Sequence, residues 1–295
     1  MKVRFSMIVF IILSFFHYGI QIAYCEFPNS EMSREEAKRL FTDANEKYLQ
    51  AAKFIAAKNV QEAEQKLKDA SLQYETILAH GFKNGQIYYN LGNTYYRQGE
   101  LGKAILNYHK AERLLPRNAD LDANLRLAKG AAEDKELSTE IPVAIQRIFF
   151  WFFLLNQNEL SILTVSLYVM TMIALFFFII RKHAWLKRVL IGLSAALLIV
   201  LISLGGKIYM EHGVDRGVVV TTKCEVRYGP GEEYEPKFEV HNGAECVIED
   251  ENDDWYRVYV KVGIKQDTDS KTSAEGKVSK DMRRGWLQKK YVDVI

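Results

Sequence analysis

Cysteine and histidine, the residues most often used for catalysis, are few and scattered in this chain. The cysteines are Cys25, Cys224 and Cys246, and the histidines lie at 17, 80, 109, 183, 212 and 241. No HExxH, G-x-S-x-G or phosphate-binding glycine motif is present. His241 with Cys224 or Cys246 resembles a thiol–base pair, but His241 is predicted to lie in a turn. We therefore expect a protein that is not an enzyme and holds no cofactor or metal.

Cys224 and Cys246 can also have a structural role, because they lie 22 residues apart in one predicted domain. The sequence allows either a disulfide or two buried free thiols at these positions, because the geometry of the fold decides between them.

Total charge excludes one further class of protein. Lys and Arg number 39 against 37 Asp and Glu, a net charge of +2, which gives no basic surface for nucleic acid.

Binding is better supported than catalysis, because residues 85–118 follow the tetratricopeptide pattern of two antiparallel helices. The matching positions are Tyr88, Leu91, Gly92, Tyr95, Gly99, Ala104, Tyr108, Ala111 and Pro116. Gly92 and Ala104 are small where the helices must touch, and the tyrosines fill the space beside them. The spacing thus predicts a helix, a turn at Gly99 and a second helix ended by Pro116.

A single repeat cannot bury its own apolar face, so neighbouring helices are required. Residues 40–48 and 63–77 resemble a degenerate helix pair, joined over 52–60 by more residues than the consensus turn needs. Residues 121–128 resemble a capping helix. We predict a tetratricopeptide-repeat domain over 33–129 and a linker over 130–147.

The first helix of each pair lines the concave face of such a domain. The residues predicted on that face are Asn45, Gln86, Tyr89, Asn93, Tyr96 and Arg97. Asparagine can hydrogen-bond the main chain of a bound peptide, and tyrosine offers a rigid contact surface. The alternative is that these are solvated residues of a module that only packs.

Three apolar segments indicate a membrane protein. Residues 1–25 have the order of a secretory signal sequence, in which Cys25 is removed, retained or acylated as an anchor. Residues 160–180 and 189–206 are 21 and 18 residues without a charge, long enough to cross a bilayer. The aromatic segment 148–159 favours the membrane interface over an extension of the first spanning helix.

The orientation follows from residues 181–188, which join the two predicted spanning helices. This segment holds Arg181, Lys182, Lys187 and Arg188 and no acidic residue, so the positive-inside rule places it in the cytoplasm. Both flanking domains then lie on the opposite side. The predicted signal sequence independently indicates that the N-terminal domain is exported to that same side.

Residues 215–295 alternate apolar and polar residues and predict a small barrel. The order V-R-x-G-P, N-G, D-W-Y-R-V and G-W-L resembles bacterial SH3-like domains, and a polar insertion at Gly263–Arg284 is predicted as a surface loop. Trp255, Trp286 and Tyr256 are expected in the core or in a groove. The predicted fold class is a multi-domain membrane protein with all-α tetratricopeptide repeats, a two-helix transmembrane hairpin and an all-β SH3-like barrel.

This order of domains resembles the tetratricopeptide/SH3 type of the Bacteroides aerotolerance (Bat) operon family. The strongest local match runs from Tyr88 to Tyr108. The resemblance implies a bacterial inner membrane protein with two periplasmic domains, a role in oxygen tolerance or envelope stress, von Willebrand A-domain partners and an indirect link to a MoxR-class ATPase. Two functions stay open: a protein–protein interaction scaffold, and an envelope sensor whose SH3-like domain binds peptidoglycan.

Overall fold

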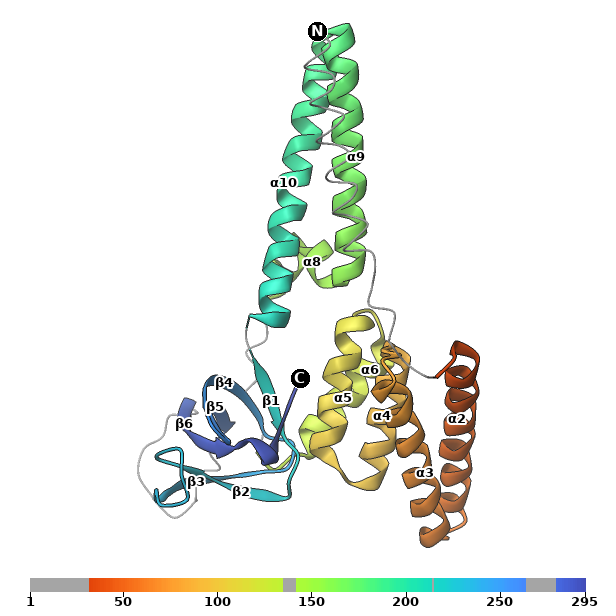
Figure 1. Ribbon diagram of the computed structural model, residues 1–295, viewed down its shortest axis with the longest axis vertical. Helices are drawn as coiled ribbons and strands as arrows, with labels where there is room; N and C mark the ends of the chain where they lie inside the picture. The colour runs from red at the N-terminus through yellow and green to blue at the C-terminus, as the bar shows by residue number, and fades with distance from the viewer. Residues whose placement is uncertain (1–31, 135–141, 214, 264–279) are drawn as a thin grey trace. The chain divides into compact units, whose positions relative to one another are not determined.

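The computed structural model describes residues 32–134, 142–213, 215–263 and 280–295 (Figure 1). The chain divides into two compact units, residues 1–83 and 84–295. The predicted signal sequence, with Cys25, lies outside the described residues, as does most of the predicted insertion at Gly263–Arg284. The last part of that insertion is a strand rather than a loop, because β6 begins at Lys280.

The first unit contains one long antiparallel helix pair, α2 (Arg34–Ala56) and α3 (Val60–Ala79). The expectation of an extended join over 52–60 is wrong, since α2 continues through most of that segment. Helix-forming residues fill it, and Lys58, with a φ of 59°, makes the short turn before the Asn59 cap. Ala44 and Tyr74 are fully buried between the two helices.

The second unit begins with three helices, α4 (Gly85–Gln98), α5 (Leu101–Leu114) and α6 (Ala119–Ala131). A Cβ on Gly92 of α4 would lie 2.7 Å from the Tyr108 ring and 3.3 Å from the Ala104 carbonyl of α5. Only glycine therefore allows α4 and α5 to approach this closely. The small and aromatic positions predicted from the repeat pattern are the ones that form this contact.

Two short helices, α7 (Val143–Ile148) and α8 (Phe150–Leu154), precede two long ones. The long helices are α9 (Gln157–Arg181) and α10 (Ala184–His212), and each is long and apolar enough to cross a membrane. α9 begins at a capping box in which Asn156 and Glu159 satisfy each other's main-chain N–H groups. This cap separates α9 from the aromatic helix α8.

α9 and α10 lie side by side (Figure 1), and on each helix partly or fully buried residues form one row, the seam. The seam residues of α9 are Leu160, Thr164, Leu167, Thr171, Ala174 and Phe178. Those of α10 are Leu186, Leu190, Leu193, Leu197, Val200 and Leu204. Steps of three and four residues are typical of left-handed antiparallel packing. Apolar side chains outside the seam are exposed on both helices.

The C-terminal part of the second unit is an antiparallel sheet with the strand order β3-β2-β6-β5-β4-β1-β7. Its strands are β1 (Arg216–Val219), β2 (Lys223–Arg227), β3 (Pro236–His241), β4 (Glu245–Asn252), β5 (Trp255–Gly263), β6 (Lys280–Gln288) and β7 (Val292–Val294). A short 3-10 helix, Lys289–Tyr291, precedes β7. The sheet surrounds one apolar core that includes Val226, Val240, Val258 and Leu287.

The expectation of a closed barrel is wrong. In the part of the chain that the structure describes, β3 and β7 do not pair with each other, so these two strands are the edges of an open sheet. β7 is only three residues long and already pairs with β1. β2 and β6 share a single register pair, Arg227 with Trp286. Closure of a barrel needs continuous pairing around the ring, which is missing between β3 and the three-residue β7.

The Gly92 contact makes a testable prediction about stability. Gly92→Ala places a methyl group against the Tyr108 ring and should destabilise the protein by about 1–3 kcal/mol. Gly130→Ala in α6 is the matched control, because its Cβ would meet no atom within 4 Å. The control should be neutral or stabilising by up to about 1 kcal/mol, since alanine favours helix more than glycine. Thermal unfolding of the full chain in detergent, followed by circular dichroism, measures both; equal melting temperatures would contradict the prediction.

Candidate partner-binding site

Five of the predicted binding residues lie on α4, whose ends are held by its own sequence. The Asn84 side chain caps the N-terminus by accepting a hydrogen bond from the Gln86 main-chain N–H at 2.8 Å. Gly99 ends the helix in the left-handed conformation, with a φ of 81°. Between these caps, Gln86, Tyr89 and Asn93 recur at three- and four-residue spacing and lie on one face.

The Asn93 side chain is held by residues from two neighbouring helices. Its Oδ1 accepts hydrogen bonds from the Tyr108 hydroxyl of α5 and from Asn124 Nδ2 of α6, each at 2.8 Å. Asn124 Nδ2 also donates to the Tyr89 hydroxyl at 3.1 Å. Within the part of the chain that the structure describes, Asn93 Nδ2 has no acceptor. The network therefore fixes the amide and leaves its two N–H donors for a ligand.

The other residues of this face differ in how far they reach solvent. Gln86 and Arg97 are exposed, and Tyr89 and Tyr96 are half-buried. Gln86 Nε2 donates to Asn90 on the same helix at 3.0 Å, which holds its side chain along the helix surface. A partner would meet polar side chains at the two ends of the face and tyrosine rings between them.

Asn45 has the same local setting in the first unit. Its Oδ1 accepts a hydrogen bond from the hydroxyl of the buried Tyr74 at 2.6 Å, as Asn93 does from Tyr108. Ala44, beside Asn45, is a small residue, as Gly92 is beside Asn93. The α2/α3 pair therefore repeats the interior of the α4/α5 pair, although its helices are longer.

The three aromatic residues predicted for the core or a groove of the sheet differ in burial. Trp255 is buried on β5, Trp286 is half-buried on β6, and Tyr256 packs against the core. Lys289 Nζ lies 5.1 Å from the centre of the Tyr256 ring and covers it. The structure thus buries Trp255, packs Tyr256 against the core and leaves Trp286 partly exposed.

Cys224 and Cys246 are both free thiols in the sheet core. Burial raises the pKa of each thiol to about 12, so neither forms a thiolate at neutral pH. Cys246 Sγ is 3.5 Å from the Gly217 carbonyl, to which it donates. His241 contacts Asp134 rather than either thiol, so the residues of the candidate thiol–base pair are used elsewhere.

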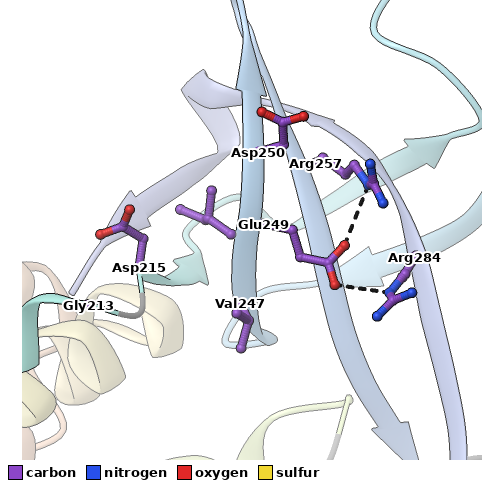
Figure 2. Close-up of a pocket in the computed structure, with 8 residues that line it drawn as sticks. Gly213, Asp215, Val247, Glu249, Asp250, Arg257 and Arg284 are labelled. Carbon is purple, nitrogen blue, oxygen red and sulfur yellow. Dashed lines mark ion pairs between the residues drawn. The ribbon is translucent and has the colours of Figure 1, made fainter. Parts of the chain in front are cut away.

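A pocket of about 580 Å³ is lined by Gly213, Asp215 and residues of β4, β5 and β6 (Figure 2). Glu249 lies between two arginines there, with its carboxylate 3.5 Å from Arg257 Nε and 3.0 Å from Arg284 Nε. These side chains satisfy one another across three strands. Among the described residues, no group of three or more metal-ligating side chains is present.

A contact between the repeat and the sheet has no counterpart in the sequence patterns. Glu100, the cap residue of α5, makes no capping hydrogen bond with its own side chain. Asn242, in the turn between β3 and β4, caps α5 instead by accepting a hydrogen bond from Gly102 N at 2.6 Å. A Cβ on Gly102 would lie 2.1 Å from the Val219 carbonyl, so the helix rests directly on the sheet. Asn242-Gly243 was predictable as a turn, but its partner 140 residues away was not.

A charged cluster centred on His109 strengthens the same interface. His109 Nε2 is 3.1 Å from Glu245 of β4, His109 Nδ1 is 3.1 Å from Glu112, and Lys129 Nζ is 2.6 Å from Glu245. Burial lowers the pKa of His109, but the carboxylates of Glu112 and Glu245 raise it by more, so the net shift is upward. Hydrogen bonds from His109 and Lys129 outweigh burial and lower the pKa of Glu245 to about 2.

Comparison with known proteins supports the helical part of this description. Residues 85–118, which contain α4 and α5, match the tetratricopeptide repeat family. No curated protein matches the chain. The repeat indicates a protein–protein interaction module, so proteins are the general class of partner.

The His109 cluster predicts that stability depends on pH. A raised folded-state pKa means that His109 contributes fully below its unfolded value of about 6.5 and loses its contribution as pH rises through the folded value. The melting temperature of the full chain in detergent should therefore fall as pH rises above about 6.5, while Glu112 and Glu245 stay ionised. His109→Gln should flatten this dependence. An equally steep profile in the variant would show that another group titrates.

Proposed function

We propose that this protein is a membrane-anchored scaffold that binds another protein through the α4 face of its repeat domain. The observation that carries the proposal is Asn93, whose carbonyl oxygen is held by Tyr108 and Asn124 while its N–H donors stay available. A fixed amide loses little side-chain freedom when it binds a peptide carbonyl. Tyr89 and Tyr96 add rigid contact surface on the same helix.

The proposed membrane anchor is α9 with α10. Large apolar side chains are exposed along both helices, for example Ile162 and Ile202 at 67% each and Ile191 at 60%. A core helix of a soluble protein would bury these side chains, and so large an exposed apolar surface is unfavourable in water. A bilayer accepts them, and it also explains why only one seam of each helix is packed.

The proposed orientation places the repeats and the sheet outside the cytoplasm. It rests on Arg181, Lys182, Lys187 and Arg188, which cluster at the α9–α10 connection. Under this proposal α8, with Trp151 and three phenylalanines, lies at the interface on the opposite side from that connection.

The more specific assignment, to a family and a physiological role, rests on the order of domains alone. The resemblance to the Bat family supports an inner-membrane protein of aerotolerance or envelope stress, with von Willebrand A-domain membrane proteins as partners. We propose a binding rather than a catalytic role. The open sheet gives no support to the alternative of a peptidoglycan receptor, which relied on likeness to a closed SH3-like barrel.

The binding proposal predicts the effect of one amide-to-acid change. Asn93→Asp keeps the oxygen that accepts from Tyr108 and Asn124 but removes both N–H donors and adds a negative charge. Partner capture by cross-linking in intact cells should fall about tenfold, which is the loss of one or two hydrogen bonds. Gln61→Glu, the same chemical change at an exposed position of α3, is the matched control. Unchanged capture by Asn93→Asp in a folded chain would rule out this face.

The orientation predicts a labelling pattern for two single cysteines in a Cys25→Ser background. Leu127→Cys on α6 and Trp185→Cys at the start of α10 are similarly exposed, at 57% and 60%. A membrane-impermeant maleimide should label Leu127→Cys in intact cells and Trp185→Cys only after lysis. The maleimide should not label Cys224 or Cys246, because both thiols are buried and the pKa of each is raised to about 12. The reverse pattern would show the opposite orientation.

A further inference from the structure

A cavity of about 250 Å³ lies within the second unit, where α5, α8, α10 and β1 meet. Six of its lining residues form two chemical groups: the cationic Arg113, Lys207 and Arg216, and the apolar Phe152, Phe153 and Met210. Neither the repeat pattern nor the sheet pattern predicts this combination. The cavity is distinct from the α4 face, because it is lined from the second helix of the repeat.

The two arginines of the cavity are not neutralised. Neither Arg113 nor Arg216 makes an ion pair with any residue that the structure describes. Glu112, an acidic residue that also lines the cavity, is hydrogen-bonded to His109 at 3.1 Å, and that bond lowers its pKa. Two unpaired guanidinium groups facing one cavity favour a phosphate or carboxylate, which arginine binds through paired hydrogen bonds.

The third cation is held in place by main-chain carbonyls. Lys207 Nζ donates to the carbonyl of Phe152 at 3.1 Å and to that of Leu155. It also lies 5.6 Å from the centre of the Phe152 ring. These contacts join α8 to α10 and bring an aromatic wall beside the positive charges. The cavity thus has a cationic side and an apolar side.

The position of the cavity along α10 suggests what fills it. Lys207 directly follows the charge-free run 189–206, and Met210 lies one turn further on. If α9 and α10 cross a bilayer, as the proposed function requires, this level is where hydrocarbon gives way to headgroups. A ligand there would carry a negative group for the arginines and an apolar chain for the phenylalanines.

We propose that this cavity binds the headgroup of an anionic phospholipid. Arg113 and Arg216 hold its phosphate, and Phe152 and Phe153 contact the first part of its acyl chains. Clusters of basic residues beside a membrane segment favour anionic lipids in the same way. The bound lipid would join the repeat helix α5 to the membrane surface.

The test is lipid binding to the purified full chain in detergent, measured by native mass spectrometry. Dioleoyl phosphatidylglycerol should bind at least about tenfold more tightly than dioleoyl phosphatidylcholine, because both carry the phosphate but the choline cation of the second is repelled by the cationic side of the cavity. Arg113→Ala with Arg216→Ala should abolish this preference. Arg181→Ala with Arg188→Ala removes the same charge at the α9–α10 connection and should keep it.

The following results would overturn the proposal. Equal binding of the two lipids, or a preference that survives in the Arg113/Arg216 variant, would show that the cavity does not select an anionic headgroup. Inorganic phosphate that competes fully at millimolar concentration would assign the site to free phosphate. If the chain fractionates with membranes but does not prefer the anionic lipid, only this inference is overturned. If the chain is absent from membranes, the proposed function is overturned as well.

Discussion

The contact between the Tyr108 ring and Gly92 determines the geometry of the repeat. The ring occupies the space where any other residue at position 92 would place a Cβ, so α4 and α5 lie in direct contact. The same tyrosine turns its hydroxyl toward Asn93, and Asn124 of α6 completes the arrangement. One buried aromatic side chain therefore sets the distance between two helices and also orients the polar group proposed to bind a partner. The Tyr74–Asn45 hydrogen bond shows the same solution in the first unit.

The repeat does not stand free of the sheet within the second unit. Asn242 caps α5, and His109 and Lys129 reach Glu245, so a turn and a strand of the sheet satisfy groups that the helices leave open. Helix N-termini carry unsatisfied N–H groups, and a cap supplied from elsewhere in the chain joins two folding units. A ligand on α4 would thus bind to a module whose second helix is fixed to the sheet.

The exposed apolar surface of α9 and α10 has consequences for both proposals. Packing along one seam leaves most of each helix to be covered by something other than protein of this unit. The proposed membrane anchor would hold the proposed binding module at a membrane surface, where linked weak contacts gain avidity. The cavity beside Lys207 lies where the proposed anchor ends, so under both proposals the bilayer would be the support of the protein and a source of its ligand.

The local structure was predictable because it depends on spacing that the sequence displays directly. Gly92, Ala104 and Tyr108 predict the helix pair, the charge-free runs predict α9 and α10, and Asn242-Gly243 predicts the β3–β4 turn. The open edge of the sheet was not predictable, because alternation of apolar and polar residues indicates strands but not whether β3 pairs with β7. Nor was the extension of α2, where the consensus turn suggested an early end.

By itself, then, the sequence determined the repeat helix pair, most of the strands, the apolar segments and the face of α4 that is proposed to bind a partner. Only the tertiary structure decided that Asn93 is oriented by Tyr108 and Asn124, that Asn242 caps α5, and that Arg113 and Arg216 line one cavity. The physical reason is distance along the chain. Periodicity reports neighbours three or four residues apart, whereas hydrogen bonds and charges over tens of residues depend on how the elements pack.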